Sequence, residues 1–127
     1  MSATLLWQPS DAQIQSSHLS RFMAIASARS GRSLASYAEL YDWSIQDSES
    51  FWSLLWDFSE VRGQKGERIL ENGADIEKAV WFPEARLNFA ENLLREPPAG
   101  GEAVAIYFKA EDHAIRTLSY HQLYDQV

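Results

Sequence analysis

A short segment rich in proline and glycine, Pro97–Gly101, divides this sequence of 127 residues into two parts with different hydrophobic periodicity. Before it, apolar residues recur every three or four positions, which predicts amphipathic helices. After it, every residue over 104–108 is apolar, as in a strand that is covered on both faces. We therefore expect a mainly helical module over residues 1–96, a linker over residues 97–101 and the start of an α/β domain over residues 102–127.

The second part is too short to complete the domain that its first strand implies. A strand buried on both faces needs neighbouring strands and covering helices. Only Ile115–Leu118 is left to pair with it, followed by a helix for which Ser119 is a suitable N-cap. Because an isolated hairpin is marginally stable in water, we expect residues 102–127 to be the first β-hairpin of a truncated α/β domain, and the chain as it stands to be α+β.

Helix-start signals place the elements of the first part. Ser10 and Ser36 each stand three residues before Gln or Glu, the arrangement of a capping box, in which two side chains satisfy the first free backbone donors of a helix. Gly31 suits the left-handed conformation that ends a helix, and Pro83 suits a first helical turn. The predicted elements are helices over residues 10–30, 44–61 and 84–95, a short turn over residues 36–41 and a short strand over residues 68–70.

The helix predicted over residues 44–61 is apolar around more of its circumference than one core can cover. At about 100° per residue, its apolar side chains span an arc of roughly 220°. A helix that lies on one core needs a stripe of only a little over about 100°. We therefore expect this helix to contact two bodies: the first helix, and either an absent domain or a second copy of the chain. In the chain alone, Trp52 or Trp56 should be partly exposed.

The charge balance argues against two classes of partner. The sequence has 18 acidic and 11 basic residues, which gives a formal net charge of −7 at pH 7, and the basic residues are scattered singly. Nucleic acids and anionic membranes both favour a basic patch, so neither is expected as a partner. The first residues lack the features of a secretory signal and the sequence has no cysteine, so we expect a cytoplasmic protein.

No arrangement of residues predicts a chemical site. The motifs of nucleophilic hydrolases and P-loop nucleotidases do not occur, and His18, His113 and His121 lack the spacing of metal ligands. His18 falls in the apolar sector of the first predicted helix, which favours a core or boundary histidine. Carboxylates that could act in pairs lie on polar faces or in turns, which favours solvated surface; they are Asp57, Glu60, Glu91, Glu111 and Asp112. We therefore assign no catalytic, cofactor-binding or metal-ligating residue.

One segment carries a family resemblance. Residues 81–94 read Trp-Phe-Pro-Glu-Ala-Arg-Leu-Asn-Phe-Ala-Glu-Asn-Leu-Leu. This segment closely resembles a signature of the acetoacetyl-CoA synthetases, which are AMP-forming acyl-CoA synthetases of the adenylate-forming enzyme family. Residues 117–123 resemble the entry into an AMP-binding domain, whereas Glu84 departs from the Gly expected in the signature. The resemblance implies a structural role for the signature residues Trp81, Phe82, Pro83, Arg86, Leu87, Asn88, Glu91 and Asn92.

The resemblance also implies a parent enzyme and its reaction. In that reaction ATP activates acetoacetate to an acyl-adenylate with release of diphosphate, and the acyl group then passes to CoA with release of AMP. ATP, Mg and CoA are implied for the parent, yet no loop of hydroxyl residues with a Lys that could hold a triphosphate occurs here. We therefore expect this fragment to be structural and catalytically inert, with the remainder of its own catalytic domain as its partner and self-association as a second expectation.

Two alternatives stay open. Arg86 falls in the middle of the apolar sector of the helix predicted over residues 84–95. Because a buried guanidinium must find acceptors, we interpret Arg86 as a structural clamp onto carbonyls or a carboxylate; the alternative is contact with an anionic ligand such as a CoA phosphate in the complete enzyme. For the whole chain, the alternative function is a free-standing helical adaptor that binds a partner protein through a Trp-rich surface. A reading frame that continues past Val127 would favour the ligase.

Overall fold

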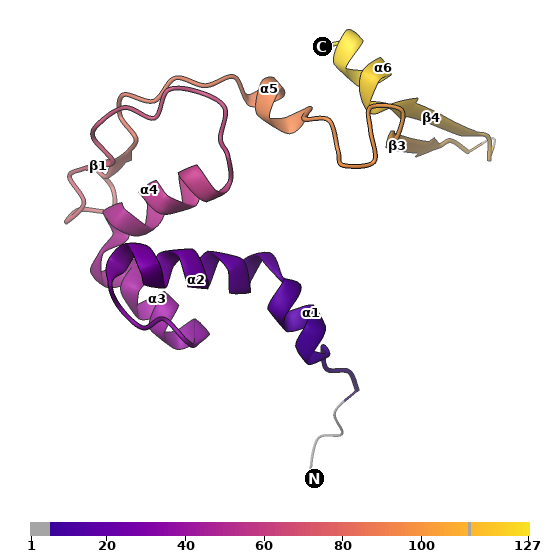
Figure 1. The fold of residues 1–127 in the computed structure, drawn as a ribbon. Helices are drawn as coiled ribbons and strands as arrows, with labels where there is room; N and C mark the ends of the chain where they lie inside the picture. The colour runs from indigo at the N-terminus through magenta and orange to yellow at the C-terminus, as the bar shows by residue number, and fades with distance from the viewer. Residues whose placement is uncertain (1–5, 112) are drawn as a thin grey trace. The chain divides into compact units, whose positions relative to one another are not determined.

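The computed structural model describes residues 6–111 and 113–127, which form two compact units (Figure 1). The first unit contains the described residues up to Val61 together with Glu67–Pro83, and the second contains Arg62–Gly66 and Glu84–Val127. The elements of the first unit are α1 (Asp11–Ser16), α2 (His18–Ser30), α3 (Tyr37–Gln46), α4 (Ser48–Phe58), β1 (Leu70–Glu71) and β2 (Val80–Trp81). Those of the second are α5 (Phe89–Leu93), β3 (Val104–Lys109), β4 (Ile115–Ser119) and α6 (Tyr120–Asp125). The described part of the chain is thus α+β, as expected from the sequence.

The core of the first unit lies where α2, α3 and α4 pack together. Trp43 of α3 is 1% exposed, and its ring meets that of Phe51 of α4 edge-on at 5.8 Å. Phe22 of α2 packs edge-on against Phe51 at 5.6 Å and against Phe58 at 5.1 Å. The buried residues of this core are Phe22, Ala26, Leu34, Leu40, Trp43 and Leu54. The contact of α4 with the helix that carries Phe22 confirms one of the two bodies expected from its wide apolar arc.

The first predicted helix, over residues 10–30, is two helices that meet at Ser17. The capping box at Ser10 forms as predicted, and Gly31 ends α2 in the left-handed conformation with φ 67°. Ser17, however, is extended, and its hydroxyl oxygen accepts a hydrogen bond from the Ser20 N–H at 3.1 Å. The Ser20 hydroxyl in turn donates to the Ile14 carbonyl oxygen at 2.6 Å. These serine side chains take the place of backbone groups in the hydrogen bonds of a continuous helix. The prediction of one helix over residues 10–30 was therefore wrong.

The turn predicted over residues 36–41 is a full helix, α3. Its capping box forms: the Ser36 hydroxyl oxygen accepts from the Glu39 N–H at 3.2 Å, and the Glu39 carboxylate accepts from the Ser36 N–H at 2.8 Å. The hydrogen bond from the Ser36 side chain, followed by that from its backbone, lowers the pKa of Glu39 below its usual value. The prediction was too short because α3 buries only Leu40 and Trp43 and leaves Tyr37 exposed, so its apolar period is weak.

The helix predicted over residues 44–61 is α4, and both of its ends differ from the prediction. Ser44 lies inside α3, where its hydroxyl donates to the Tyr41 carbonyl oxygen at 2.7 Å. The N-cap of α4 is Asp47, whose carboxylate accepts from the Ser50 N–H at 3.4 Å. The helix ends at Phe58, and Glu60 beyond it has φ 52°, a left-handed value that stops helical hydrogen bonding.

A small sheet follows α4 in the first unit. The strand predicted over residues 68–70 is displaced to Leu70–Glu71, and it pairs antiparallel with β2, which the sequence reasoning missed. The loop between these strands contains Asp75, whose carboxylate is 2.7 Å from the Lys78 ammonium. This ion pair, followed by a hydrogen bond from the Glu77 N–H, lowers the pKa of Asp75 below its usual value.

The helix predicted over residues 84–95 is present only as α5, which begins at Phe89. Pro83 does not start it; its N-cap is Asn88, whose side chain accepts from the Glu91 N–H at 3.3 Å. The segment before it is extended because Arg86 exchanges two backbone hydrogen bonds with Gln64, at 2.8 and 2.9 Å. A helical pattern read from one segment cannot reveal such a distant partner, and so the prediction failed.

The predicted hairpin is present in the second unit. Strands β3 and β4 pair antiparallel, with an irregularity between Val104 and Ile106, and Ser119 begins α6 with a capping box to Gln122. Large apolar side chains of the hairpin, such as Tyr107 and Ile115, are exposed. That residues 102–127 open a larger α/β domain, and that the domain boundaries lie at residues 96 and 102, stay predictions.

Candidate functional site

The signature segment over residues 81–92 is divided between the two units, and its aromatic half lies in the first. The ring of Trp81 packs against Trp52 of α4 with centroids 5.7 Å apart, and the ring of Phe82 packs against Trp56 at 4.9 Å. Phe82 has φ 47°, a strained value for a bulky residue. Its backbone N–H donates to the Ile69 carbonyl oxygen at 2.8 Å. Ring packing and this hydrogen bond hold Phe82 in that conformation.

An apolar pocket of about 250 Å³ lies beside these aromatic pairs. Its lining consists of Trp52, Leu55, Trp56, Ser59, Val61 and Phe82. Trp52 of α4 is 42% exposed, which confirms the expectation that Trp52 or Trp56 is partly exposed. Trp81 of β2 is 41% exposed. The lining contains no titratable side chain, so the pocket can pack an apolar group but offers no acid or base.

The polar half of the signature lies in the second unit and centres on the Asn92 side chain. The Arg62 N–H donates to the Asn92 side-chain carbonyl oxygen (Oδ1) at 2.8 Å, and the Asn92 amide nitrogen (Nδ2) donates to the Arg62 carbonyl oxygen at 2.8 Å. The same nitrogen donates to the Asn88 carbonyl oxygen at 2.9 Å, and an Arg95 guanidinium nitrogen donates to Asn92 Oδ1 at 2.7 Å. Asn92 therefore binds two stretches of backbone that are far apart in sequence.

Arg86 does not occupy the position that the sequence predicts. It lies in the extended segment before α5, its side chain is exposed, and its backbone is what contacts Gln64. The prediction that Arg86 lies in the apolar sector of a helix was therefore wrong, because the helix begins only at Phe89. That Arg86 has a structural role in a complete enzyme stays a prediction. Of the other signature residues of this unit, Leu87, Asn88 and Glu91 are also exposed.

The histidines and carboxylates named from the sequence lie at exposed positions where the structure describes them. His18 is exposed, with its ring 2.9 Å from an Arg21 guanidinium nitrogen and edge-on to Phe58 at 6.4 Å. His121 pairs with Glu102 at 3.0 Å. The carboxylates of Asp57, Glu60, Glu91 and Glu111 belong to exposed residues, and Asp112 lies outside the described residues. Among the described residues, no group of three or more His, Cys, Asp or Glu side chains could hold a metal ion.

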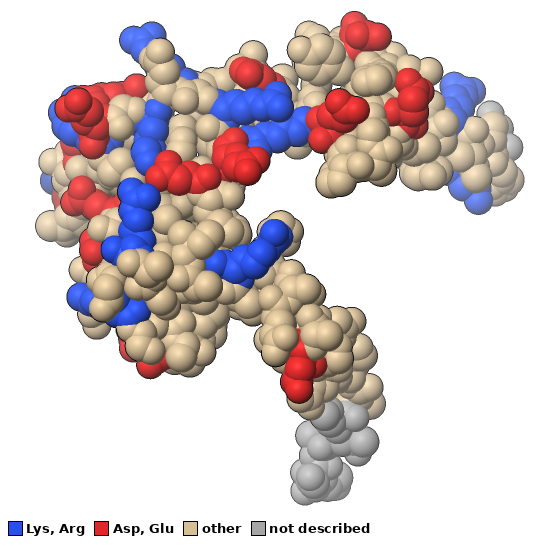
Figure 2. Space-filling model, viewed as in Figure 1, with Lys and Arg blue, Asp and Glu red and all other residues tan. Residues whose placement is uncertain are grey.

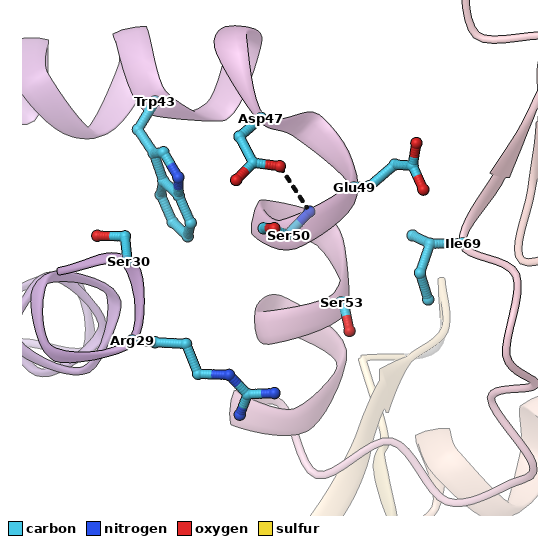
Figure 3. A pocket seen from close by; sticks show the side chains of 8 residues that line it. All are labelled: Arg29, Ser30, Trp43, Asp47, Glu49, Ser50, Ser53 and Ile69. Carbon is cyan, nitrogen blue, oxygen red and sulfur yellow. Dashed lines mark hydrogen bonds between the residues drawn. The ribbon is translucent and has the colours of Figure 1, made fainter. Parts of the chain in front are cut away.

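A polar pocket of about 500 Å³ lies at the junction of α3 and α4 in the first unit (Figure 3). Arg29 lines it together with the carboxylates of Asp47 and Glu49, and the Asp47 carboxylate is engaged as the N-cap of α4. The Arg29 guanidinium also lies 4.0 Å from the Asp57 carboxylate. Because the lining mixes one guanidinium with two carboxylates, it favours neither an anion nor a cation.

The surface charges follow the same mixed pattern. On the face that Figure 2 shows, Lys and Arg side chains lie among Asp and Glu side chains. None of the helices in residues 6–111 and 113–127 is long and apolar enough to cross a bilayer. Within each unit, the signature segment provides ring packing or hydrogen bonds to backbone.

Comparison with known proteins agrees with the signature. Residues 37–93, from the start of α3 to the end of α5, match the family described as acetyl-coenzyme A synthetase N-terminus. The acetoacetyl-coenzyme A synthetase of Rhizobium meliloti (strain 1021) is 38% identical over 118 residues, which are 93% of this chain and 18% of that protein. The solved structure of the acetoacetyl-CoA synthetase from Streptomyces lividans matches with a TM-score of 0.79 and 29% identity, covering 94% of this chain and 19% of that one. The chain is similar to the N-terminal region of acetoacetyl-CoA synthetases.

The similarity extends to a ligase with a different named product. A malonamoyl-CoA synthetase from Penicillium aethiopicum is 36% identical over 107 residues, which are 80% of this chain and 14% of that protein. The chain therefore spans less than a fifth of the length of each of these acetoacetyl-CoA and malonamoyl-CoA synthetases. The match to the Streptomyces synthetase extends over nearly the whole chain, so it includes residues of both units.

Proposed function

We propose that this chain serves as the N-terminal region of an AMP-forming acid–CoA ligase. The observation that carries the proposal is the similarity to acetoacetyl-CoA synthetases over 93% of the chain in sequence and 94% in structure. A likeness restricted to one unit could come from a widely reused helical module. The observed likeness extends across helices and hairpin together, which favours a role within this kind of enzyme.

In the proposed complete enzyme, ATP, acetoacetate and CoA are converted to acetoacetyl-CoA, AMP and diphosphate. A carboxylate oxygen of the acid attacks the α-phosphorus of ATP and expels diphosphate, and the CoA thiolate then attacks the acyl carbon and expels AMP. Mg would neutralise phosphate charge during the first step. We assign none of these steps to the present residues; ATP, Mg and CoA would be held by other parts of the enzyme.

The role proposed for this region is to brace the catalytic body. Its signature residues make ring contacts and backbone hydrogen bonds: Trp81 and Phe82 pack on α4, and Asn92 binds the backbone of Arg62. Such contacts fix the shape of a module without touching a reacting atom. The proposed partner is the remainder of the ligase, in the cytoplasm, with neither nucleic acid nor membrane as a partner.

A chimera tests this proposal. This chain would replace the matching region of the Rhizobium enzyme, and synthesis of acetoacetyl-CoA would be measured beside the parent enzyme and a variant that lacks the region. We expect the chimera to be active and the deletion variant to be inactive or unfolded. A chimera that folds with a native circular dichroism spectrum but makes no acetoacetyl-CoA, or a deletion variant with full activity, would contradict the proposal.

Catalytic inertness of the chain alone has a separate test. ATP–diphosphate exchange would be measured for the purified 127-residue chain with acetoacetate, acetate or butyrate. We expect no exchange above a boiled control, because the sequence contains no loop of hydroxyl residues with a Lys that could hold the triphosphate. Exchange that copurifies with the chain would show that adenylation residues are present in it.

A free-standing adaptor is the second candidate, and the exposed tryptophans favour it. Trp52 and Trp81 together present a partly exposed aromatic surface, and such surfaces are common at protein interfaces. The chimera separates the two functions. The aromatic surface serves the ligase if Trp52→Ala lowers the activity of the chimera and Tyr107→Ala, a control on the exposed hairpin, does not. The adaptor function requires the activity of the chimera to be independent of Trp52.

A further inference from the structure

The loop between β1 and β2 begins with an asparagine followed by a glycine, Asn72 and Gly73. Asn72 has φ 55°, a left-handed value that asparagine tolerates better than most residues do. A Cβ atom added at Gly73 would lie 2.4 Å from Leu70 Cδ2, so an alanine there would displace the half-buried Leu70 side chain. The turn that closes this small sheet therefore favours asparagine at the first position and glycine at the second.

The same two residues form a chemically reactive pair. Asparagine is among the thermally labile residues of proteins, because the next backbone nitrogen can attack its side-chain amide carbon, Cγ. Glycine favours this attack since it has no Cβ to hinder its nitrogen and the widest choice of backbone conformations. Asn72 and Gly73 are both exposed, so water and hydroxide reach the Asn72 Cγ and the Gly73 N–H.

The other two asparagines of the sequence, Asn88 and Asn92, provide a comparison within the same chain. The Asn92 carboxamide accepts from the Arg62 N–H and donates to the Arg62 carbonyl oxygen, each at 2.8 Å. The Asn88 side chain is the N-cap of α5 and accepts from the Glu91 N–H at 3.3 Å. Both asparagines are followed by a residue of α5 with a large side chain, which hinders the next backbone nitrogen. Ring closure at either position must also break these hydrogen bonds.

The structure holds the Asn72 side chain less firmly. Its amide nitrogen donates to the Lys78 carbonyl oxygen at 3.4 Å, which is longer than usual for a hydrogen bond between nitrogen and oxygen, and both residues are exposed. The Asn72 carbonyl oxygen accepts from the Asp75 N–H at 3.0 Å, a bond that fixes the backbone of the turn and leaves Cγ accessible.

We propose that Asn72 is a site of spontaneous deamidation and that the reaction loosens the aromatic half of the signature. Hydroxide removes the Gly73 N–H proton, and the nitrogen attacks the Asn72 Cγ. The Cγ–Nδ2 bond breaks, and the amide leaves as ammonia after taking a proton from water, which regenerates hydroxide. Water then adds to either carbonyl carbon of the resulting succinimide and breaks the bond from that carbon to the Gly73 nitrogen. The products are aspartate and isoaspartate, in which the main chain passes through Cγ.

The position of Asn72 connects this reaction to the aromatic pairs. Asn72 directly follows β1, whose register places Leu70 opposite Trp81 of β2. Either product adds a carboxylate beside Glu71, and isoaspartate also lengthens the main chain at the end of β1. Strands of two residues have little stability of their own, so this change should disturb their register. Trp81 and Phe82 would then pack less tightly on α4.

Peptide mass spectrometry of the 127-residue chain, incubated in mildly alkaline buffer made with heavy-oxygen water, tests the site. Each conversion incorporates a heavy oxygen atom, and fragmentation identifies isoaspartate. We expect Asn72 to convert roughly tenfold faster or more than Asn88 or Asn92, because the hydrogen bonds at the latter two must break first. In urea this difference should narrow, since those hydrogen bonds are lost while the effect of Gly73 remains.

Two variants test the effect on the aromatic pairs. Asn72→Gly tolerates the positive φ and has no side-chain amide, so its tryptophan emission should stay constant during the incubation. Asn72→Asp, measured before incubation, shows the effect of the added charge without the longer main chain. In the unchanged chain the emission should shift to longer wavelength as isoaspartate accumulates, and by more than in Asn72→Asp.

Equal conversion of the three asparagines in the folded chain would overturn the assignment of Asn72, as would a difference that does not narrow in urea. Complete conversion with unchanged tryptophan emission, or the same shift in Asn72→Gly, would overturn the effect on the aromatic pairs.

Discussion

Replacing Leu54 by Ala should remove a large fraction of the stability of the first unit. Leu54 is 4% exposed in a core that contains six buried residues, so the cavity left behind has few neighbours that can fill it. Leu-to-Ala changes at buried positions cost about 3 kcal/mol or more. Small domains are stable by only about 5 to 15 kcal/mol, so this one change would consume a large share.

Leu19 provides a matched control, because it is a leucine on a helix of the same unit and is 46% exposed. Leu19→Ala should cost less than about 1 kcal/mol. All five tryptophans of the sequence lie in the first unit, so tryptophan fluorescence during urea unfolding reports on that unit alone. With a urea dependence of about 2 kcal/mol per M, Leu54→Ala should lower the unfolding midpoint by about 1.5 M. Equal midpoints for the two variants would refute the assignment of Leu54 to the core.

Three more outcomes are expected. The chain should bind ANS or self-associate in size-exclusion runs over a concentration series, because Trp52 and Trp81 are partly exposed; a monomer without dye binding would contradict this. Because the pKa of Glu39 is lowered, its contribution to the stability of α3 is present above the unfolded-state pKa and is lost as the pH falls through the folded-state pKa. Ser36→Ala should therefore raise the pKa of Glu39 in an NMR titration. An unchanged pKa would refute the capping box as the cause of the shift. Arg86→Ala should change the free energy of unfolding by less than about 0.5 kcal/mol, because the side chain is exposed. A larger loss of stability in thermal melts would show that the Arg86 side chain stabilises the fold.

Local signals in the sequence predicted the starts of several helices. Ser10 and Ser36 each form the predicted capping box, and Ser119, predicted as an N-cap, also forms one with Gln122, because all of these hydrogen bonds are made within three residues. The same locality explains Gly31 at the end of α2. Where both partners are adjacent in sequence, the pattern alone is sufficient.

The extended segment before α5 could not be predicted in this way. Residues 84–87 have a helical apolar pattern, but the Arg86 backbone bonds to Gln64, which lies in the loop after α4. Ser17 presents the opposite case: its partner is near, but a run of two serines can either continue a helix or break it, and the Ser20 hydrogen bonds decide between them. The predicted burial of Arg86 was wrong for the same reason as the predicted helix, because it depended on a helix over residues 84–95.

The two halves of the signature solve the same physical problem with different chemistry. Strands β1 and β2 are two residues long, and a sheet of that size is unstable by itself, so the rings of Trp81 and Phe82 attach it to α4. The segment Arg62–Gly66 pairs with Arg86 through the Gln64 backbone, and the Asn92 carboxamide attaches Arg62 to α5. In each unit a short stretch of backbone is fixed to a helix by side chains from residues 81–92. A module built in this way holds loops in defined positions with a small core, which is what a bracing role in a larger enzyme requires.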